Sequence, residues 1–244
     1  MRLNPAMHCP DLVRRMGGIG VLLSLMVVTV AAQAPAAFTR TIYLIRHGNA
    51  DYSVKGDETV VNGLTPLGIA QARLTAARLR GLPVKFTSLV ASPLTRARET
   101  GQIIQQELQL PLQISPLLRE STPRTWRTEV TKGETPASLD AAEAQLNEAF
   151  ARYCVPARDA DRQDVLVCHG NVIRYFVTKA LGVDTQAWLG MSLVNGSLTI
   201  IQVKADGSCK VLAVGDAGHI PPNLQSGLTA AEPQLVVTPA AASR

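Results

Sequence analysis

Short apolar runs alternate with helical segments through most of this 244-residue chain. The runs show little polar alternation, which is typical of strands buried on both faces of a parallel sheet. They cover residues 41–46, 86–91 and 164–168, with a further short extended stretch at 112–118. Because helical segments separate them, the pattern predicts an α/β fold: a doubly wound, mostly parallel sheet in a three-layer α/β/α sandwich.

Helix signals fill the intervals between these strands. Thr65-Pro66 supplies an N-cap and a first-turn proline, apolar residues follow at spacings of three and four, and Gly81 ends the segment. Ser92-Pro93 has the same form and predicts a helix to about residue 108. Two further helices are predicted over 138–154 and 171–181.

The last part of the chain changes in character. Two apolar runs, 193–204 and 209–214, predict a terminal antiparallel unit, and Asn195-Gly196 is typical of a hairpin turn. Residues 224–244 are rich in Ala, Pro, Gln and Thr and show no periodicity, which predicts a disordered tail. The folded domain is therefore expected to span residues 35–223.

The first 34 residues are typical of a targeting segment. Three arginines precede an apolar run from Ile19 to Ala32, which is shorter than the about 20 residues of a membrane span. Ala32-Gln33-Ala34 has the small-x-small form of a cleavage site. The pattern predicts a secretory signal peptide, with a membrane anchor through residues 17–34 as the alternative. We therefore expect an exported protein, either periplasmic or membrane-anchored.

Composition excludes several classes of function. Hydrophobic residues make up 46% of the chain and charged residues 18%, so a substantial core can form. The net charge is +5, and no run of Lys or Arg indicates nucleic-acid binding. Aromatic residues are only 4%, which argues against a protein that stacks on bases. The common zinc-site spacings of Cys and His are also absent from the sequence.

Histidine and arginine residues follow the predicted strands. His47 and His169 come directly after two of them, and Arg96 lies near the start of the helix that follows a third. The carboxyl ends of parallel strands meet at one edge of a sheet, where ligands bind in such folds. Arg46, His47, Arg96 and His169 are therefore expected to converge on one site.

These residue types suit a phosphomonoester, which carries about −1.5 to −2 charges at neutral pH. Arg46 and Arg96 can grip phosphate oxygens, and the helix that begins at Gly170 offers free N–H groups to an anion. An unprotonated imidazole is a competent nucleophile, and a carboxylic acid can protonate the leaving alkoxide. Glu120 is the candidate acid, although its spacing alone favours an ordinary surface position.

Three blocks of sequence, in this order, resemble the histidine phosphatase superfamily, also called the phosphoglycerate-mutase-like family. They are Arg-His-Gly at 46–48, Ser-Pro-Leu-Thr-Arg-Ala-Arg-Glu-Thr at 92–100 and Cys-His-Gly-Asn-Val-Ile-Arg at 168–174. The resemblance covers about residues 41–223 and implies a doubly wound sheet between helices. It implies catalysis without a metal or other cofactor.

The resemblance also implies a role for each candidate residue. His47 would be the phosphorylated nucleophile and Glu120 the proton donor. Arg46, Arg96, His169 and the Gly170 N–H would hold the phosphoryl group. The expected function is hydrolysis of a phosphomonoester through a phosphohistidine intermediate, with a phosphorylated protein or small molecule as the partner and no nucleic acid.

Four further segments resemble one branch of the family, which contains a mitochondrial serine/threonine protein phosphatase. They cover residues 117–120, 168–176, 193–197 and 215–222. That branch has Ser where this chain has Gly48, and the tryptophan-containing assembly motif expected before the catalytic domain is missing, which leaves the oligomeric state open. Phosphoserine and phosphothreonine proteins are therefore the first expectation for the substrate.

Three alternatives remain open at this point: phosphoglycerate-mutase-type transfer, a phosphohistidine phosphatase, and a non-catalytic module that binds a phosphorylated ligand. The acid phosphatase and phytase branch carries Arg-His-Gly-x-Arg-x-Pro, whereas this chain continues Asn-Ala-Asp after Gly48. The missing second Arg and the missing Pro argue against that branch.

Overall fold

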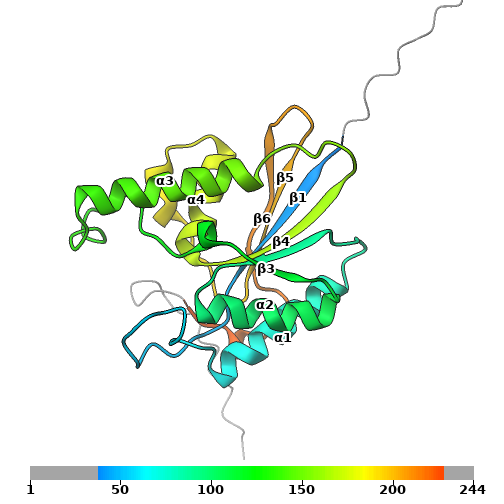
Figure 1. Cartoon of the computed structure of the whole chain (residues 1–244), viewed down its shortest axis with the longest axis horizontal. Helices are drawn as coiled ribbons and strands as arrows, with labels where there is room; N and C mark the ends of the chain where they lie inside the picture. Colours follow the sequence, from blue (N-terminus) through cyan, green and yellow to red (C-terminus); the bar gives the residue numbers. More distant parts are fainter. Residues whose placement is uncertain (1–37, 228–244) are drawn as a thin grey trace, which may run out of the picture. The chain divides into compact units, whose positions relative to one another are not determined.

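The computed structural model describes residues 38–227 (Figure 1). The predicted leader and most of the predicted tail lie outside this range. The strands are β1 (Arg40–Arg46), β2 (Ser88–Ala91), β3 (Leu112–Ile114), β4 (Arg162–Cys168), β5 (Leu198–Val203) and β6 (Cys209–Asp216). The α-helices are α1 (Pro66–Arg80), α2 (Thr95–Leu108), α3 (Pro136–Tyr153) and α4 (Gly170–Leu181). Within residues 38–227, no helix has the length and apolar character needed to span a bilayer.

The strands form one mixed sheet in the order β3-β2-β4-β1-β5-β6. Neighbours from β3 to β1 pair in parallel, whereas β5 pairs antiparallel with both β1 and β6. The predicted mostly parallel sheet and terminal antiparallel unit are confirmed. In the register, Arg46 pairs with Cys168 and Ala91 with Val167, so β1, β2 and β4 end at the same edge.

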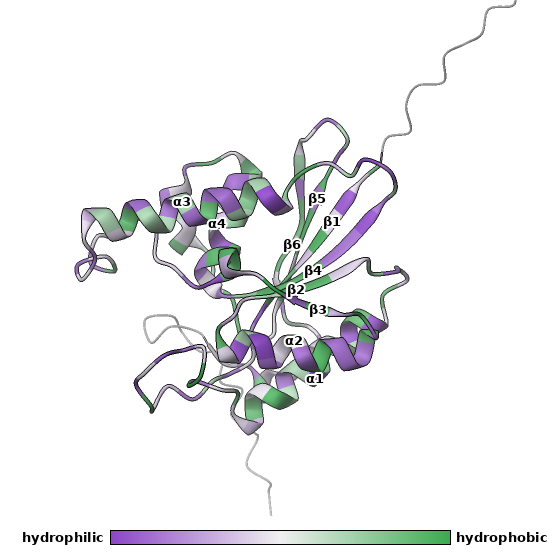
Figure 2. Ribbon diagram, viewed as in Figure 1, coloured by the Kyte–Doolittle hydropathy of each residue, from purple (hydrophilic) through white to green (hydrophobic). Residues whose placement is uncertain are grey.

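Two apolar cores lie on opposite faces of the sheet. Successive residues of a strand point to opposite faces, so Ile42 and Leu44 pack into the core with α3 and α4, whereas Tyr43 and Ile45 pack into the core with α1 and α2. Figure 1 shows the two helix pairs on either side of the sheet. Green and purple segments alternate along the helices in Figure 2, as expected for helices with one apolar face. Each fully buried aliphatic side chain contributes about 1.5–3 kcal/mol.

Local signals place α1 as predicted. The Thr65 hydroxyl accepts from the Gly68 N–H at 3.1 Å, and Gly81 follows the last turn. The same prediction for Ser92 is wrong, because α2 begins only at Thr95 and has no side-chain N-cap. The Ser92 N–H instead extends the ladder to the Val167 carbonyl at 2.9 Å, which turns the hydroxyl toward the end of β4.

Two predictions about the end of the chain are corrected by the structure. Asn195-Gly196 forms a turn before β5, while the hairpin joins β5 to β6 through residues 204–208. The sequence pattern assigns residues 224–227 to a disordered tail. In the structure, these residues form hydrogen bonds with the rest of the domain. The folded domain therefore extends to at least residue 227.

Candidate active site

The four residues expected to converge do so at the carboxyl edge of the sheet. The rings of His47 and His169 lie with their centroids 5.1 Å apart, tilted by 59°. Arg96 Nε lies 3.3 Å from His47 Nε2, and all three side chains are buried. Arg46 ends β1, directly before His47. Two imidazoles and two guanidinium groups thus share one site.

The surroundings of His47 select one tautomer. Its Nδ1 lies 2.7 Å from the Gly48 carbonyl oxygen, which can only accept a hydrogen bond, so Nδ1 carries the proton. Nε2 is then unprotonated and accepts from Arg96. Burial, and after it the charges of Arg46 and Arg96, hold the pKa of His47 well below its usual range. His47 is therefore a neutral imidazole with its Nε2 lone pair toward a guanidinium group.

His169 is also neutral. Burial first, and then the nearby His47 and arginines, hold its pKa well below the usual range. Its Nε2 lies 2.8 Å from the hydroxyl of Ser92, which explains why Ser92 is not a helix cap. Its Nδ1 is buried and has no hydrogen-bond partner among the described residues. Such an unmet group costs about 1–3 kcal/mol, which a ligand that bonds to it can recover.

Glu120 belongs to this site rather than to the surface. Its Oε1 accepts from the Asn171 N–H at 3.2 Å, in the first turn of α4. Burial raises the pKa of Glu120 from an ordinary 4.5 to about 7, although the neighbouring arginines act in the opposite direction. The group can therefore hold or release a proton at neutral pH, as a general acid and base requires.

Sequence reasoning missed the residues that hold the backbone around His47. Asn195 Nδ2 donates to the His47 carbonyl at 2.9 Å, and the Gly196 N–H donates to the Arg46 carbonyl at 2.9 Å. On the other side, the Gly48 N–H donates to Thr100 Oγ1 at 3.1 Å. Thr100 lies in one of the quoted blocks and Asn195 in one of the branch segments, so the motifs contained a signal for both.

A third arginine, Arg174, is buried at the same edge. Its Nε donates to the Met191 carbonyl at 2.9 Å, and its charge acts to lower the pKa of Glu120. Arg174 closes the block that contains His169, and this membership was the signal that could have found it. Its position beside Glu120 makes it part of the electrostatic environment of the site.

Close backbone packing fixes the turn after β1. Gly48 and Gly68 lie so near each other that a β-carbon at Gly48 would overlap the Gly68 carbonyl oxygen. A β-carbon at Gly68 would overlap the Asn49 carbonyl oxygen. In this chain, the glycine of Arg-His-Gly therefore allows the first turn of α1 to pack directly on the loop that carries His47.

Residues 224–227 contribute to the same region. The Gly227 carbonyl accepts from Arg46 Nη1 at 2.7 Å, and the Leu193 carbonyl accepts from the same nitrogen. The Ser226 carbonyl accepts from the Asn195 N–H at 2.8 Å. The segment therefore supports both an arginine of the site and the turn that holds His47.

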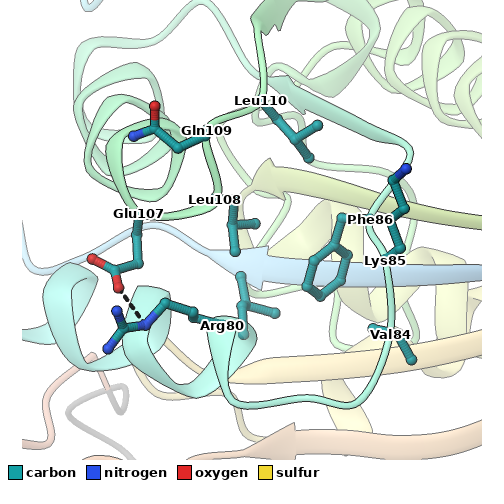
Figure 3. A pocket seen from close by; sticks show the side chains of 9 residues that line it. Arg80, Val84, Lys85, Phe86, Glu107, Leu108, Gln109 and Leu110 are labelled. Carbon is teal, nitrogen blue, oxygen red and sulfur yellow. Dashed lines mark ion pairs between the residues drawn. The ribbon is translucent and has the colours of Figure 1, made fainter.

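A separate cavity of about 350 Å³ lies at the other end of α1 and α2 (Figure 3). It is lined by Leu79, Phe86, Leu108 and Leu110, with the ion pair between Arg80 and Glu107 at its rim. The four convergent residues and Glu120 do not line it. It is therefore distinct from the site at the strand ends.

Comparison with known proteins agrees with this geometry. The chain matches the profile of the histidine phosphatase superfamily (branch 1) over residues 42–152 and 124–217. It is 39% identical over 199 residues to the mitochondrial serine/threonine-protein phosphatase Pgam5 of Caenorhabditis elegans, covering 77% of this chain and 66% of the relative. It is 38% identical over 194 residues to PGAM5 of Homo sapiens, with the same coverage of 77% and 66%. The chain thus spans about two thirds of these relatives' length.

Solved structures show the same fold. The phosphoglycerate mutase of Plasmodium falciparum is 28% identical, with a TM-score of 0.52 over 73% of this chain and 91% of that one. A mycobacterial glucosyl-3-phosphoglycerate phosphatase is 21% identical, with a TM-score of 0.56 over 73% of this chain and 100% of that one. This second likeness shows the fold alone.

The expected export of the protein, to the periplasm or in a membrane-anchored form, is wrong as to destination. The relatives are named mitochondrial, which points to mitochondria rather than to export. Mitochondrial transit peptides are also rich in arginine and poor in acidic residues, so a basic leader does not separate the two destinations.

The predicted family and the predicted phosphatase activity are confirmed, and mutase-type transfer is not favoured. The fold, the order of the three sequence blocks and the profile match over most of the domain agree. The chain belongs to the histidine phosphatase superfamily, branch 1.

Proposed function

We propose that this phosphatase removes phosphate from phosphoserine and phosphothreonine in proteins, through a phosphohistidine intermediate on His47. The observation that carries the mechanism is the pairing of a neutral His47, whose Nε2 accepts from Arg96 at 3.3 Å, with a Glu120 whose pKa is about 7. A nucleophile and a proton donor are thus both in the required state at neutral pH.

In the first step, Arg46, Arg96, His169 and the Gly170 N–H hold the phosphoryl oxygens. Arg96 Nε then transfers its hydrogen bond from His47 to the phosphate. The lone pair of Nε2 attacks phosphorus and the P–O ester bond breaks. Protonated Glu120 gives its proton to the leaving oxygen, so the alcohol departs neutral.

In the second step, water attacks the phosphorus atom of phosphohistidine. Glu120 is now a carboxylate and accepts a proton from this water. The P–N bond breaks, its electron pair returns to Nε2, and inorganic phosphate leaves. The two steps use one carboxyl group in opposite directions, which its pKa of about 7 permits.

The substrate class rests on the relatives, which are named serine/threonine-protein phosphatases at 37–39% identity. The test is a panel of phosphoserine, phosphothreonine and phosphohistidine proteins and phosphosugars, with the full chain as the enzyme. We expect the first two to be hydrolysed with the highest kcat/KM, and His47→Ala to abolish activity while retaining its thermal unfolding midpoint. A preference for phosphohistidine or phosphosugars would contradict the substrate assignment, and an active His47→Ala variant would contradict the mechanism.

Membrane attachment through residues 17–34 is a separate part of the proposal, supported by the apolar run from Ile19 to Ala32. Extraction of isolated membranes with alkaline carbonate tests it. Retention of the full chain in the membrane pellet, and its release when residues 1–34 are deleted, are the expected results. Complete release of the full chain by carbonate would contradict attachment.

A further inference from the structure

The loop from residue 51 to residue 63 contacts Arg96 on two sides. Glu58 Oε2 lies 2.8 Å from Arg96 Nη1, and the Arg96 guanidinium carbon lies 5.4 Å from the centroid of the Tyr52 ring. The Arg96 side chain is 5% exposed, whereas that of Glu58 is 41% exposed. Arg96 is thus held by a loop that lies outside the three sequence blocks.

Backbone hydrogen bonds fix the position of Glu58 on this loop. Its carbonyl accepts from the Thr95 N–H at 2.9 Å and from the Thr95 hydroxyl at 3.1 Å. The next carbonyl, of Thr59, accepts from Arg98 Nη1 at 3.1 Å. These hydrogen bonds hold the backbone of Glu58 against the first turn of α2, next to Arg96. The ion pair between Glu58 and Arg96 therefore has a fixed backbone on both sides.

The base of the loop is closed as well. Ala50 and Leu64 form a β-bridge, and the Asp51 N–H donates to the Gly63 carbonyl at 3.0 Å. The Leu64 N–H donates to Glu99 Oε2 at 2.7 Å, and Glu99 belongs to the same sequence block as Arg96. The loop is thus joined to α2 at two places, through Glu58 and Thr95 and through Leu64 and Glu99.

Arg96 uses different nitrogens for its two partners. Nη1 meets the Glu58 carboxylate, and Nε meets His47 Nε2. Because guanidinium is planar and its donors are fixed relative to one another, holding Nη1 also sets the direction of the Nε–H. The Glu58 carboxylate therefore orients the Arg96 guanidinium so that its Nε–H points toward His47.

The geometry points to Glu58 as a positioning residue that orients Arg96 toward the phosphoryl group on His47. This inference rests on the proposed function, because it assigns Arg96 a role in phosphoryl transfer. Glu58 itself contacts neither His47 nor Glu120 through any hydrogen bond of the described residues. Its effect is expected in turnover more than in fold stability, since solvent screens a carboxylate with this exposure.

Three substitutions at Glu58 distinguish the effect of its side-chain length (its reach to Arg96) from the effect of its charge. Glu58→Gln keeps an oxygen acceptor at the same reach without the charge, Glu58→Asp keeps the charge and shortens the reach, and Glu58→Ala removes both. Glu107→Ala is the matched control, because Glu107 also pairs with an arginine, at 2.6 Å, but beside the separate cavity of Figure 3.

Misplacing a catalytic group by about 1 Å can cost about 10²-fold in rate. On this basis we expect kcat for p-nitrophenyl phosphate to fall about tenfold or more in Glu58→Ala, and by more than about threefold in Glu58→Asp. In both variants KM changes less than about threefold. Glu58→Gln stays within about threefold of the unmodified protein, and Glu107→Ala is unchanged. The signal of the Arg96 Nε–H in ¹⁵N NMR spectra broadens in Glu58→Ala and Glu58→Asp only, which reports orientation independently of activity.

Full kcat in Glu58→Asp together with a loss in Glu58→Gln would overturn the inference, because charge and not reach would then matter. Unchanged kcat in all three variants would overturn it as well. If Glu58→Ala does not fold, Glu58→Asp and the NMR signal decide the question. Absence of phosphatase activity in the unmodified protein, or its persistence in His47→Ala, would instead indicate failure of the proposed function.

Discussion

The raised pKa of Glu120 makes fold stability depend on pH in a defined direction. The carboxyl group titrates at about 7 in the folded chain and near its ordinary 4.5 in the unfolded chain. Between these values the folded state holds a proton that the unfolded state has lost, so the unfolding free energy falls as pH rises. At about 1.4 kcal/mol for each pKa unit, the total loss is about 3 kcal/mol. It is absent below about pH 4.5 and complete above about pH 7.

Glu120→Gln isolates this contribution, because glutamine resembles the protonated acid and does not titrate. Urea unfolding of both proteins at pH 4 and pH 8 is the assay. The variant is expected to gain about 3 kcal/mol relative to the unmodified protein between these pH values. Its kcat should be about 10²–10⁴-fold lower, because the leaving group receives no proton. Parallel stability curves, with no relative gain at pH 8, would refute the raised pKa of Glu120 in the folded chain.

Three further predictions concern the support around His47. Gly68→Ala places a β-carbon on the Asn49 carbonyl oxygen, and urea unfolding should show a loss of about 1–3 kcal/mol. Asn195→Ala removes the donor to the His47 carbonyl and should cost about 1 kcal/mol with a lower kcat, whereas an unchanged kcat would show that this bond does not position the nucleophile. A chain ending at Asn223 loses the Gly227 carbonyl on Arg46, so calorimetry should show a lower Tm and the phosphatase assay a higher KM; identical values would mean that residues 224–227 do not support the site.

The fold and the core of the site could be predicted from local patterns. Continuous apolar runs indicate buried strands, and Thr65 and Gly81 mark the start and the end of α1. The two histidines directly follow β1 and β4. These features depend on a residue and its near neighbours in sequence, and on the rule that parallel strands end at one edge. That is why His47, His169 and Arg96 were found together.

The remaining features depend on partners far away in sequence. Ser92 has the form of a helix cap, but its hydroxyl faces His169, 77 residues later. Asn195 has the form of a hairpin turn, but its amide holds the His47 carbonyl. The pKa of Glu120 follows from burial, and Glu58 lies on a loop without any periodic pattern. Contacts of this kind are created only when the chain folds.

The leader shows a different limit. Its arginines and apolar run fit more than one destination, since export signals and mitochondrial transit peptides are both basic. The relatives point to mitochondria. Sequence pattern alone therefore predicts a targeting segment, and the destination that it predicts is wrong.

Trapping the covalent intermediate tests the proposed role of His47 most directly. The full chain is mixed with a ³²P-labelled phosphopeptide, quenched in alkali after a few milliseconds, and digested for mass spectrometry under conditions that preserve phosphohistidine. We expect one acid-labile phosphate on Nε2 of His47, formed and lost at rates that match turnover. Label on another residue, or turnover without any labelled protein, would contradict it.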